Sequence, residues 1–326
     1  MIDLCGRKID YIRISLTDRC NLRCVYCMPE EGVEFLPHEK ILSYEEILRL
    51  CRCFAALGIH KVKLTGGEPL VRKSVAYLVG ELKKIDGIDN VTITTNGLLL
   101  KSQLEDLAAA GLDAVNISLD TLEREEFLRL TRFDRIDEVL EGIEAALSFP
   151  ELAVKINCVP LYGENWEKTV VSVAGLAKER NLHVRFIELM PIGLGRERKG
   201  YGEEQLKAVL EQAYGPLTPY QELLGNGPSV YYSLEGFVGK IGFISAVSHK
   251  FCGQCNRIRL TSEGFLKNCL QYSAGTDLRA LLRERADDEL LLKTIYETIQ
   301  KKPKGHQFGR EQLSDAEERR MSEIGG

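Results

Sequence analysis

Six of the ten cysteines in this 326-residue chain fall into two closely spaced triplets. The first triplet has the spacing C-x3-C-x2-C and the second C-x2-C-x13-C, and their members are Cys20, Cys24, Cys27, Cys252, Cys255 and Cys269. A four-iron cluster needs a thiolate on each iron to be fully closed. Three thiolates leave one iron open, so that it can bind a small molecule and pass an electron into it. We therefore expect the first triplet to hold an iron–sulfur cluster, and the second triplet again offers three thiolates.

A structural zinc site is the alternative interpretation of each triplet. Zinc needs a fourth protein ligand. His38 is the only histidine near the first triplet, and His249 precedes the second. Zinc knuckles also favour paired C-x2-C units, and the spacing of the first triplet is unusual for them. The other four cysteines are expected to be core or incidental thiols: Cys5, Cys51, Cys53 and Cys158.

Polar and basic residues mark the predicted strands and their ends. One strand ends in the run Thr65-Gly66-Gly67-Glu68-Pro69, whose paired glycines let a ligand approach the backbone closely. Basic residues occur on several strands, at Arg13, Lys61 or Lys63, Lys155 and Arg185. Their burial inside a barrel is costly without an anionic partner. A triphosphate would be such a partner, and because no G-x4-G-K-[ST] segment exists, side chains would have to bind it.

Strand-like and helix-like segments alternate through the first two-thirds of the chain. The predicted strands are residues 11–16, 61–65, 91–95, 114–119, 153–159 and 183–189, and the predicted helices include 75–85, 104–110, 136–147 and 167–179. Another helix is expected to begin at Ser43, with Glu46 as its capping-box partner, and to end before Gly58. This alternation predicts an α/β fold with an incomplete (βα)6 TIM-like barrel, whose chemistry lies at the carboxyl ends of the strands.

The pattern changes after Gly193. Residues 193–229 are rich in glycine and proline, the segments from Val230 to Leu260 look like antiparallel strands, and a charged helical tract begins at Asp277. We therefore predict two domains: a partial barrel over residues 1–220, and a smaller C-terminal α+β domain over residues 221–326 that closes the open side of the barrel.

Composition excludes several classes of partner. The net charge is −5, so no overall basic field favours nucleic acid or an anionic membrane. The first residues lack the basic and apolar regions of a signal peptide, and no apolar run reaches the length of a bilayer-spanning helix. We expect a cytoplasmic protein that binds neither nucleic acid nor membrane.

The motifs together carry a resemblance to a known family. The first triplet, with Tyr26 before its last cysteine, and the GGEP run resemble the signature of the radical S-adenosylmethionine (SAM) superfamily. More selective segments extend along essentially the whole chain: RISLTDRCNLRCVYCM, KLTGGEPLVR, TTNGLLL, NISLD, VKINCV, RFIELMPIG, FCGQCNRIRL and the terminal Gly325-Gly326. With these segments the chain resembles molybdenum cofactor biosynthesis protein A, the GTP 3′,8-cyclase family. The alternative is another twin-cluster radical SAM enzyme, such as a peptide-modifying maturase.

The resemblance implies two [4Fe–4S] clusters and SAM as cosubstrate. Cys20, Cys24 and Cys27 would hold the cluster that cleaves SAM, and the SAM site would be lined by Tyr26, Gly67, Ser118 and Met190. Cys252, Cys255 and Cys269 would hold a second cluster that meets the guanine of GTP. The GTP contacts would be Arg13, Lys63, Thr94, Lys155, Arg257 and Arg259, with Arg13, Arg257 and Arg259 acting in catalysis. Lys63 departs from the arginine found in comparable members, and the Gly-Gly tail is expected to thread into the active site.

The implied reaction is the first step of molybdenum cofactor synthesis. A 5′-deoxyadenosyl radical would take the hydrogen from C3′ of GTP, and the carbon radical would add to C8 of the guanine. Reduction and protonation would give (8S)-3′,8-cyclo-7,8-dihydroguanosine 5′-triphosphate. A reduced flavodoxin- or ferredoxin-type protein would donate electrons, and cyclic pyranopterin monophosphate synthase would take the product. The oligomeric state stays open, with a homodimer as one option.

Overall fold

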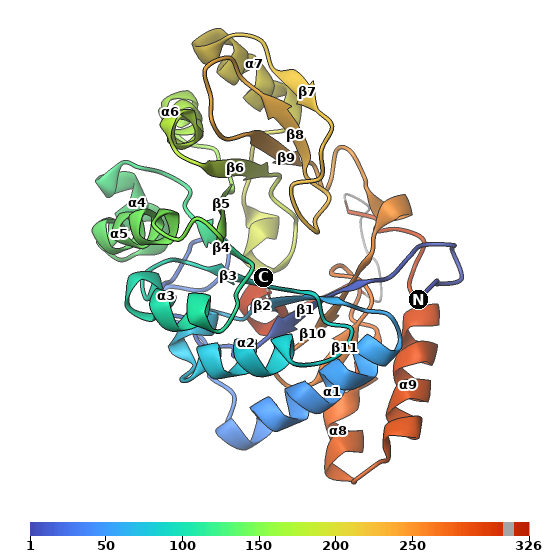
Figure 1. Ribbon diagram of the computed structural model, residues 1–326. Coiled ribbons are helices and arrows are strands. Elements are labelled where there is room, and N and C mark those ends of the chain that lie inside the picture. Colours follow the sequence, from blue (N-terminus) through green and yellow to red (C-terminus); the bar gives the residue numbers. More distant parts are fainter. Residues whose placement is uncertain (309–315, 326) are drawn as a thin grey trace.

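The computed structural model describes residues 1–308 and 316–325. Within these residues twelve strands form one sheet, which curves into an arch with helices on its outer side (Figure 1). The N-terminus lies beside α9 (Asp288–Gln300), and the C-terminal end of the chain lies near the middle of the arch (Figure 1). The last described residue, Gly325, lies beside Ser15 and Thr65.

Six parallel strands in chain order form the centre of the sheet. They are β1 (Tyr11–Ser15), β2 (Lys61–Thr65), β3 (Asn90–Thr95), β4 (Ala114–Ser118), β5 (Ala153–Cys158) and β6 (Leu182–Ile187). The helices of this part are α1 (Tyr44–Ala56), α2 (Val75–Lys83), α3 (Leu100–Ala109), α4 (Arg124–Thr131), α5 (Ile136–Leu147) and α6 (Trp166–Glu179). The predicted α/β class and incomplete (βα)6 barrel are confirmed.

The remaining strands extend the barrel at both of its edges. On one side β9 (Ile241–Ile244) pairs in parallel with β6, followed by β8 (Val230–Ser233) and β7 (Thr218–Tyr220). On the other side β10 (Arg257–Leu260) pairs in parallel with β1, followed by β11 (Phe265–Lys267) and β12 (Gly275–Asp277). The expectation of antiparallel strands over 230–260 is confirmed for β8 and β9, but β10 does not join them, because the chain after β9 crosses to the other edge of the barrel. The domain boundary near residue 220 stays a prediction.

The other helices are α7 (Glu203–Tyr214), α8 (Leu278–Arg283), α9 and α10 (Met321–Ile324), with short 3-10 helices at His38–Lys40, Pro69–Val71, Gly193–Glu197 and Cys252–Gln254. The capping box of Ser43 and Glu46 that opens α1 is confirmed. Of the described helices, none combines the length and the apolar character needed to cross a bilayer.

Strand periodicity decides which side chains enter the barrel. Successive side chains of a strand point to opposite faces of the sheet. Ile12 and Ile14 of β1 are fully buried in the hydrophobic core of the barrel, and Arg13 between them lines the interior cavity. The same alternation places Lys63 inside. By contrast, Lys61 is bonded to Asp10 at 3.0 Å, at the start of the strand. Residues two apart on a strand share a face, so Lys61 and Lys63 are separated by their position along β2: Lys63 lines the cavity, and Lys61 is the first residue of the strand.

Candidate active site

Two adjoining cavities fill the barrel. The first, of about 330 Å³, opens at the carboxyl ends of the strands, and both cysteine triplets line it. The second, of about 320 Å³, reaches the amino ends, since Asn90, Ala114 and Ala153 line it. Arg13 and Arg257 are among the residues that line both cavities. A long ligand could therefore occupy both at once.

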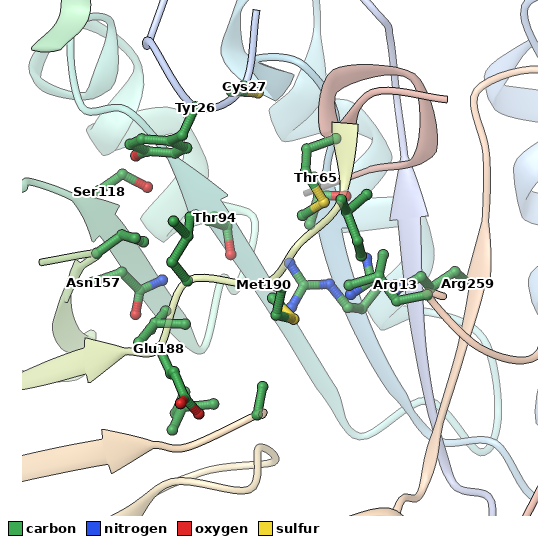
Figure 2. Close-up of a pocket in the computed structure, with 18 of the residues that line it drawn as sticks. Arg13, Tyr26, Cys27, Thr65, Thr94, Ser118, Asn157, Glu188, Met190 and Arg259 are labelled. Carbon is green, nitrogen blue, oxygen red and sulfur yellow. The ribbon is translucent and has the colours of Figure 1, made fainter. Parts of the chain in front are cut away.

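The predicted site residues gather around these cavities. Lys63 and Lys155 line the deeper one. All the others line the first one: Arg13, Cys20, Cys24, Tyr26, Cys27, Gly67, Thr94, Ser118, Met190, Cys252, Cys255, Arg257, Arg259 and Cys269. Figure 2 shows Tyr26 and Ser118 on one side of the first cavity, Arg13 and Arg259 on the other, and Met190 between them. Their roles in binding stay predictions.

The first triplet lies on the loop after β1, and backbone hydrogen bonds shape this loop. The Cys24 carbonyl accepts the N–H groups of Cys27 at 2.9 Å and Met28 at 3.0 Å. The same loop is bonded to the end of α4, where Val25 N–H donates to the Leu130 carbonyl at 2.9 Å. The three cysteines are thus presented to the cavity by a loop that is attached to the helices outside the barrel.

The paired glycines of the GGEP run lie directly under this loop. A Cβ on Gly67 would lie 2.6 Å from the Asp18 carbonyl oxygen, and one on Gly66 would lie 2.7 Å from that of Thr17. Gly67 N–H donates to the Thr17 carbonyl at 2.7 Å. Only glycine allows so close an approach between two backbones. The glycines therefore have a packing role in seating the first cysteine loop, beside the predicted role in ligand access.

Two buried carboxyl groups near the first triplet were not assigned a role from sequence. Glu68 accepts hydrogen bonds from the Thr95 hydroxyl at 2.7 Å and from Asn96 N–H at 2.6 Å, and so ties the end of β2 to that of β3. Asp120 accepts the Tyr26 hydroxyl at 2.8 Å. Burial raises the pKa of Glu68 to about 7 and that of Asp120 to about 6. Both residues stand inside the segments KLTGGEPLVR and NISLD, which is the signal that could have found them.

The second triplet lies in more basic surroundings. Lys302 is buried and donates from Nζ to the carbonyls of Arg257, at 2.7 Å, and Asn268. Burial alone would raise the pKa of the Cys255 thiol, but Lys302 and Arg257 lower it to about 7. His306 N–H donates to Cys252 Sγ at 3.4 Å. Positive charge and an N–H donor therefore already face thiols that would be negative as metal ligands.

The donor set fits iron–sulfur clusters with an open iron. All ten cysteines are free, and the six that line the cavity are partly buried. Among the described Cys, His, Asp and Glu side chains, no three form a compact metal-binding group as they stand. Three thiols at each of two places on one cavity nevertheless match the ligands that two site-open clusters need. The assignment of the six cysteines as cluster ligands stays a prediction.

The deeper cavity concentrates positive charge. Lys63, Lys155 and Arg185 are all buried, and none of the salt bridges within the described residues involves them. Burial and nearby Arg185 lower the pKa of Lys155 to about 8, and burial together with Arg185 and Arg13 lowers that of Lys63 well below its usual range. Arg185 donates to the side-chain oxygens of Asn116 and Asn157, each at 2.6 Å. A bound polyanion would offset this charge.

The C-terminal tail enters the same region. Ile324 at the end of α10 is fully buried, and the Gly325 carbonyl accepts a hydrogen bond from Arg259. A Cβ on Gly325, whose φ is +78°, would lie 3.0 Å from Ser15 Cβ and from Thr65 Oγ1. The tail therefore passes between the carboxyl ends of β1 and β2. Gly326, the other half of the predicted Gly-Gly tail, lies outside the described residues.

Comparisons with known proteins agree with this geometry. A sequence model of the radical SAM superfamily matches residues 14–173, and one described as Molybdenum Cofactor Synthesis C matches residues 182–308. The GTP 3′,8-cyclase of Heliobacterium modesticaldum is 48% identical over 329 residues, and that of Clostridium perfringens strain 13 is 45% identical over 326 residues; each alignment covers 100% of both chains. The crystal structure of Streptococcus suis SuiB bound to S-adenosylmethionine has a TM-score of 0.58 at 20% identity, covering 87% of this chain and 67% of that one.

The fold and the first cysteine loop thus define a radical SAM protein. The similarity to SuiB, at 20% identity, shows the fold alone. The full-length relatives are far more selective, and they place the chain in the GTP 3′,8-cyclase family. This family membership decides against the zinc-protein and peptide-maturase alternatives.

Proposed function

We propose that this chain converts GTP to 3′,8-cyclo-7,8-dihydro-GTP with two [4Fe–4S] clusters and SAM. The observation that carries the proposal is the shared cavity. Two sets of three thiols line it, and it adjoins a second cavity in which cations of β2, β5 and β6 are buried. A nucleoside triphosphate has the length and charge to span both.

The first triplet would hold the cluster that serves SAM. With SAM bound, this cluster supplies the 5′-deoxyadenosyl radical that takes the C3′ hydrogen. Tyr26, Gly67, Ser118 and Met190 surround the space next to the triplet and would orient SAM. The bond from Tyr26 to Asp120 keeps the phenol ring in place at the cavity wall. These residues would position SAM and exclude water, so that the radical meets only its substrate.

The GTP would lie between the second triplet and the deep cavity. Cys252, Cys255 and Cys269 would hold the second cluster next to the guanine, and Arg257 and Arg259 extend from β10 beside them. Arg13 and Thr94 line both cavities and would contact the middle of the nucleotide. Lys63 and Lys155 would bind the phosphates at the far end. Lys63, as a lysine, would contribute a point charge instead of a two-point hydrogen bond.

The cellular setting belongs to the same proposal. The chemistry needs a strong one-electron donor, and we assign this role to a reduced flavodoxin- or ferredoxin-type protein in the cytoplasm. The cyclic nucleotide would pass to a cyclic pyranopterin monophosphate synthase. Oxygen-sensitive clusters and a reactive intermediate make a reducing compartment necessary. We also propose a homodimer, which analytical ultracentrifugation of the protein with both clusters reconstituted would test.

The decisive experiment is anaerobic incubation with GTP, SAM and a reductant, followed by identification of both products. Cys24→Ala should abolish formation of 5′-deoxyadenosine, because the first cluster loses a ligand. Cys255→Ala should still form 5′-deoxyadenosine but no cyclic nucleotide. Cys5→Ala, at an exposed cysteine away from the cavity, is the matched control and should keep both. If the Cys24 and Cys255 variants cleave SAM equally well, the division of labour between the triplets is wrong.

A further inference from the structure

A buried arginine outside both cavities is bonded to the segments that carry the second triplet. The side chain of Arg7 is 4% exposed, and that of its ion-pair partner Asp3 is 1% exposed, with 2.7 Å between charged atoms. The Arg7 guanidinium also donates to the Cys252 carbonyl at 3.1 Å. It further donates to three consecutive carbonyls: Lys302 at 3.2 Å, Pro303 at 2.9 Å and Lys304 at 3.2 Å.

The first residues of the chain are folded so as to hold this guanidinium. Asp3 Oδ1 accepts the N–H groups of Cys5 and Arg7, each at 2.9 Å, and Asp3 Oδ2 accepts Arg7 Nε at 2.7 Å. Gly6 completes the turn with a φ of +76°, which glycine adopts at little cost. The turn and the ion pair therefore form one unit, in which the carboxylate fixes the direction of the arginine fork.

A second contact from the same part of the chain reaches the other end of the C-x2-C loop. Asn256 donates from its side chain to Asp10 Oδ1 at 2.7 Å, and Asp10 Oδ2 accepts Lys61 Nζ at 3.0 Å. The backbone N–H of Tyr11 donates to the Asn256 carbonyl at 3.3 Å. The loop that contains Cys252 and Cys255 is thus held at both ends by residues 3–11.

The carbonyls bound by Arg7 belong to a segment that also faces the second triplet. Lys302 Nζ donates to the carbonyl of Arg257, two residues after Cys255, at 2.7 Å, and His306 N–H donates to Cys252 Sγ at 3.4 Å. One guanidinium therefore sets the distance between the loop that carries two thiols and the chain that supplies their charge and hydrogen bond. Arginine has five N–H donors in a planar fork, and lysine cannot reproduce this arrangement.

We propose that the Asp3–Arg7 pair is a positioning unit for the second cysteine triplet and is dispensable for the first. This inference rests on the proposed function, because it assigns the second triplet a cluster of its own. Arg7 itself lines neither of the two cavities and would act only through the Cys252 loop and residues 302–306. Outer partners of metal ligands typically change metal affinity or activity by about 10–100-fold when replaced.

The test compares Arg7→Lys with the wild-type chain and with Arg49→Lys. Arg49 is a matched control because it also joins distant segments, through Asp288 at 2.8 Å and the Ala286 carbonyl at 2.6 Å, but lies away from both triplets. After anaerobic reconstitution, Arg7→Lys should retain about half of the wild-type iron and sulfide, as expected when one of two clusters is lost. Its electron paramagnetic resonance spectrum should lose the signal of one reduced cluster. Cyclisation should fall by about tenfold or more, with SAM cleavage within about twofold of wild type.

A second variant covers the case in which Arg7→Lys does not fold. Asp3→Asn keeps the shape of the turn but removes the charge that orients the guanidinium, and it should show the same selective loss to a smaller extent. Full iron content and undiminished cyclisation in both variants would overturn the inference, as would equal loss of both clusters. If the wild-type chain itself makes no cyclic nucleotide, the proposed function has failed, whereas a cyclising wild type with unaffected variants refutes only the positioning role.

Discussion

The two cysteine triplets line the same cavity but lie in different electrostatic surroundings. At the first triplet, burial raises the pKa of Cys20 to about 11 and that of Cys27 to about 12. At the second triplet, the positive charges of Lys302 and Arg257 outweigh burial and lower the pKa of Cys255 to about 7. Protein side chains therefore supply positive charge next to Cys255 of the second triplet, whereas burial dominates at Cys20 and Cys27 of the first.

This difference indicates how each site would bind its ligands. Thiolates of the first triplet would obtain their balancing charge from iron and from the sulfonium of SAM. Thiolates of the second triplet have cations nearby before any ligand arrives, and the same cations would offset the negative charge of a nucleotide. A cationic cosubstrate therefore suits the first site, and an anionic substrate suits the second.

The largest expected effect is on thiol reactivity. In metal-free protein at pH 7, iodoacetamide should modify Cys255 about a hundredfold faster than Cys20. A thiol with a pKa near 7 is about half ionised, one with a pKa near 11 is ionised to about one part in ten thousand, and the higher nucleophilicity of the more basic thiolate offsets part of this ratio. Both cysteines are partly buried, so access is comparable. Mass spectrometry of time-resolved samples measures the rates, and equal rates would remove the electrostatic contrast.

A pair of glycine variants tests the contrast in packing. Gly67→Ala should lower the free energy of unfolding by about 1–3 kcal/mol, because the new Cβ would overlap the backbone of residues 18 and 19 under the first triplet. Gly253→Ala, inside the C-x2-C loop of the second triplet, should change it by no more than about 0.5 kcal/mol, since no heavy atom lies within 4 Å of the added Cβ. Urea denaturation of the apo proteins measures both. A larger loss in Gly253→Ala would reverse the expected difference.

The pH dependence of GTP binding tests whether the cationic character extends into the deep cavity. Burial and Arg185 lower the pKa of Lys155 to about 8, so this side chain is charged below pH 8 and neutral above it. Binding of the GTP anion favours the charged form of Lys155, so that above pH 8 the side chain must take up a proton when GTP binds. The affinity for GTP should therefore fall by about tenfold between pH 7 and pH 9.

Equilibrium titration of the reconstituted protein without SAM measures this dependence. The groups around Lys155 are Lys63, Arg185 and His183. Burial lowers the pKa of His183 to about 4, so this histidine is neutral throughout the range from pH 7 to pH 9. Lys155→Arg keeps the charge and should remove the pH dependence with little loss of affinity at pH 7. The same decline in the arginine variant would assign the titration to another group, with Lys63 as the first candidate.

The barrel can be predicted from the sequence because each of its strands and helices has a pattern within a few neighbouring residues. The alternation of Ile12, Arg13 and Ile14 predicts an inward cation between two core residues, and Ser43 with Glu46 predicts the start of α1. The sequence does not predict the helix α4, because it has only eight residues and most of them are polar. The helix α7 is not predicted either, because glycines precede it and a glycine and a proline follow it directly.

Long-range contacts could not be predicted in the same way. The partners of Arg7 are up to 297 residues away, and nothing in the local pattern indicates them. The positions of β9 and β10 at opposite edges also depend on how the whole sheet is arranged. Each strand has only four residues, and its sequence pattern would fit either edge of the sheet. The grouping of the cysteines into two triplets was local, but their meeting at one cavity was inferred only through family resemblance.

The sheet order has a consequence for synthesis and for truncation of the chain. The neighbour of β1 on its outer side is β10, which follows it by more than 240 residues in the sequence. The backbone hydrogen bonds on this side of β1 can therefore form only after residue 257 has been synthesised. Until then, β1 and β6 are the outer strands of the barrel and present unpaired backbone groups that can pair with other chains. A chain stopped at residue 220 would keep both of these edges open. Pairing of β9 and β10, and not completion of the sixth β-α unit, is thus the step that protects these edges from aggregation.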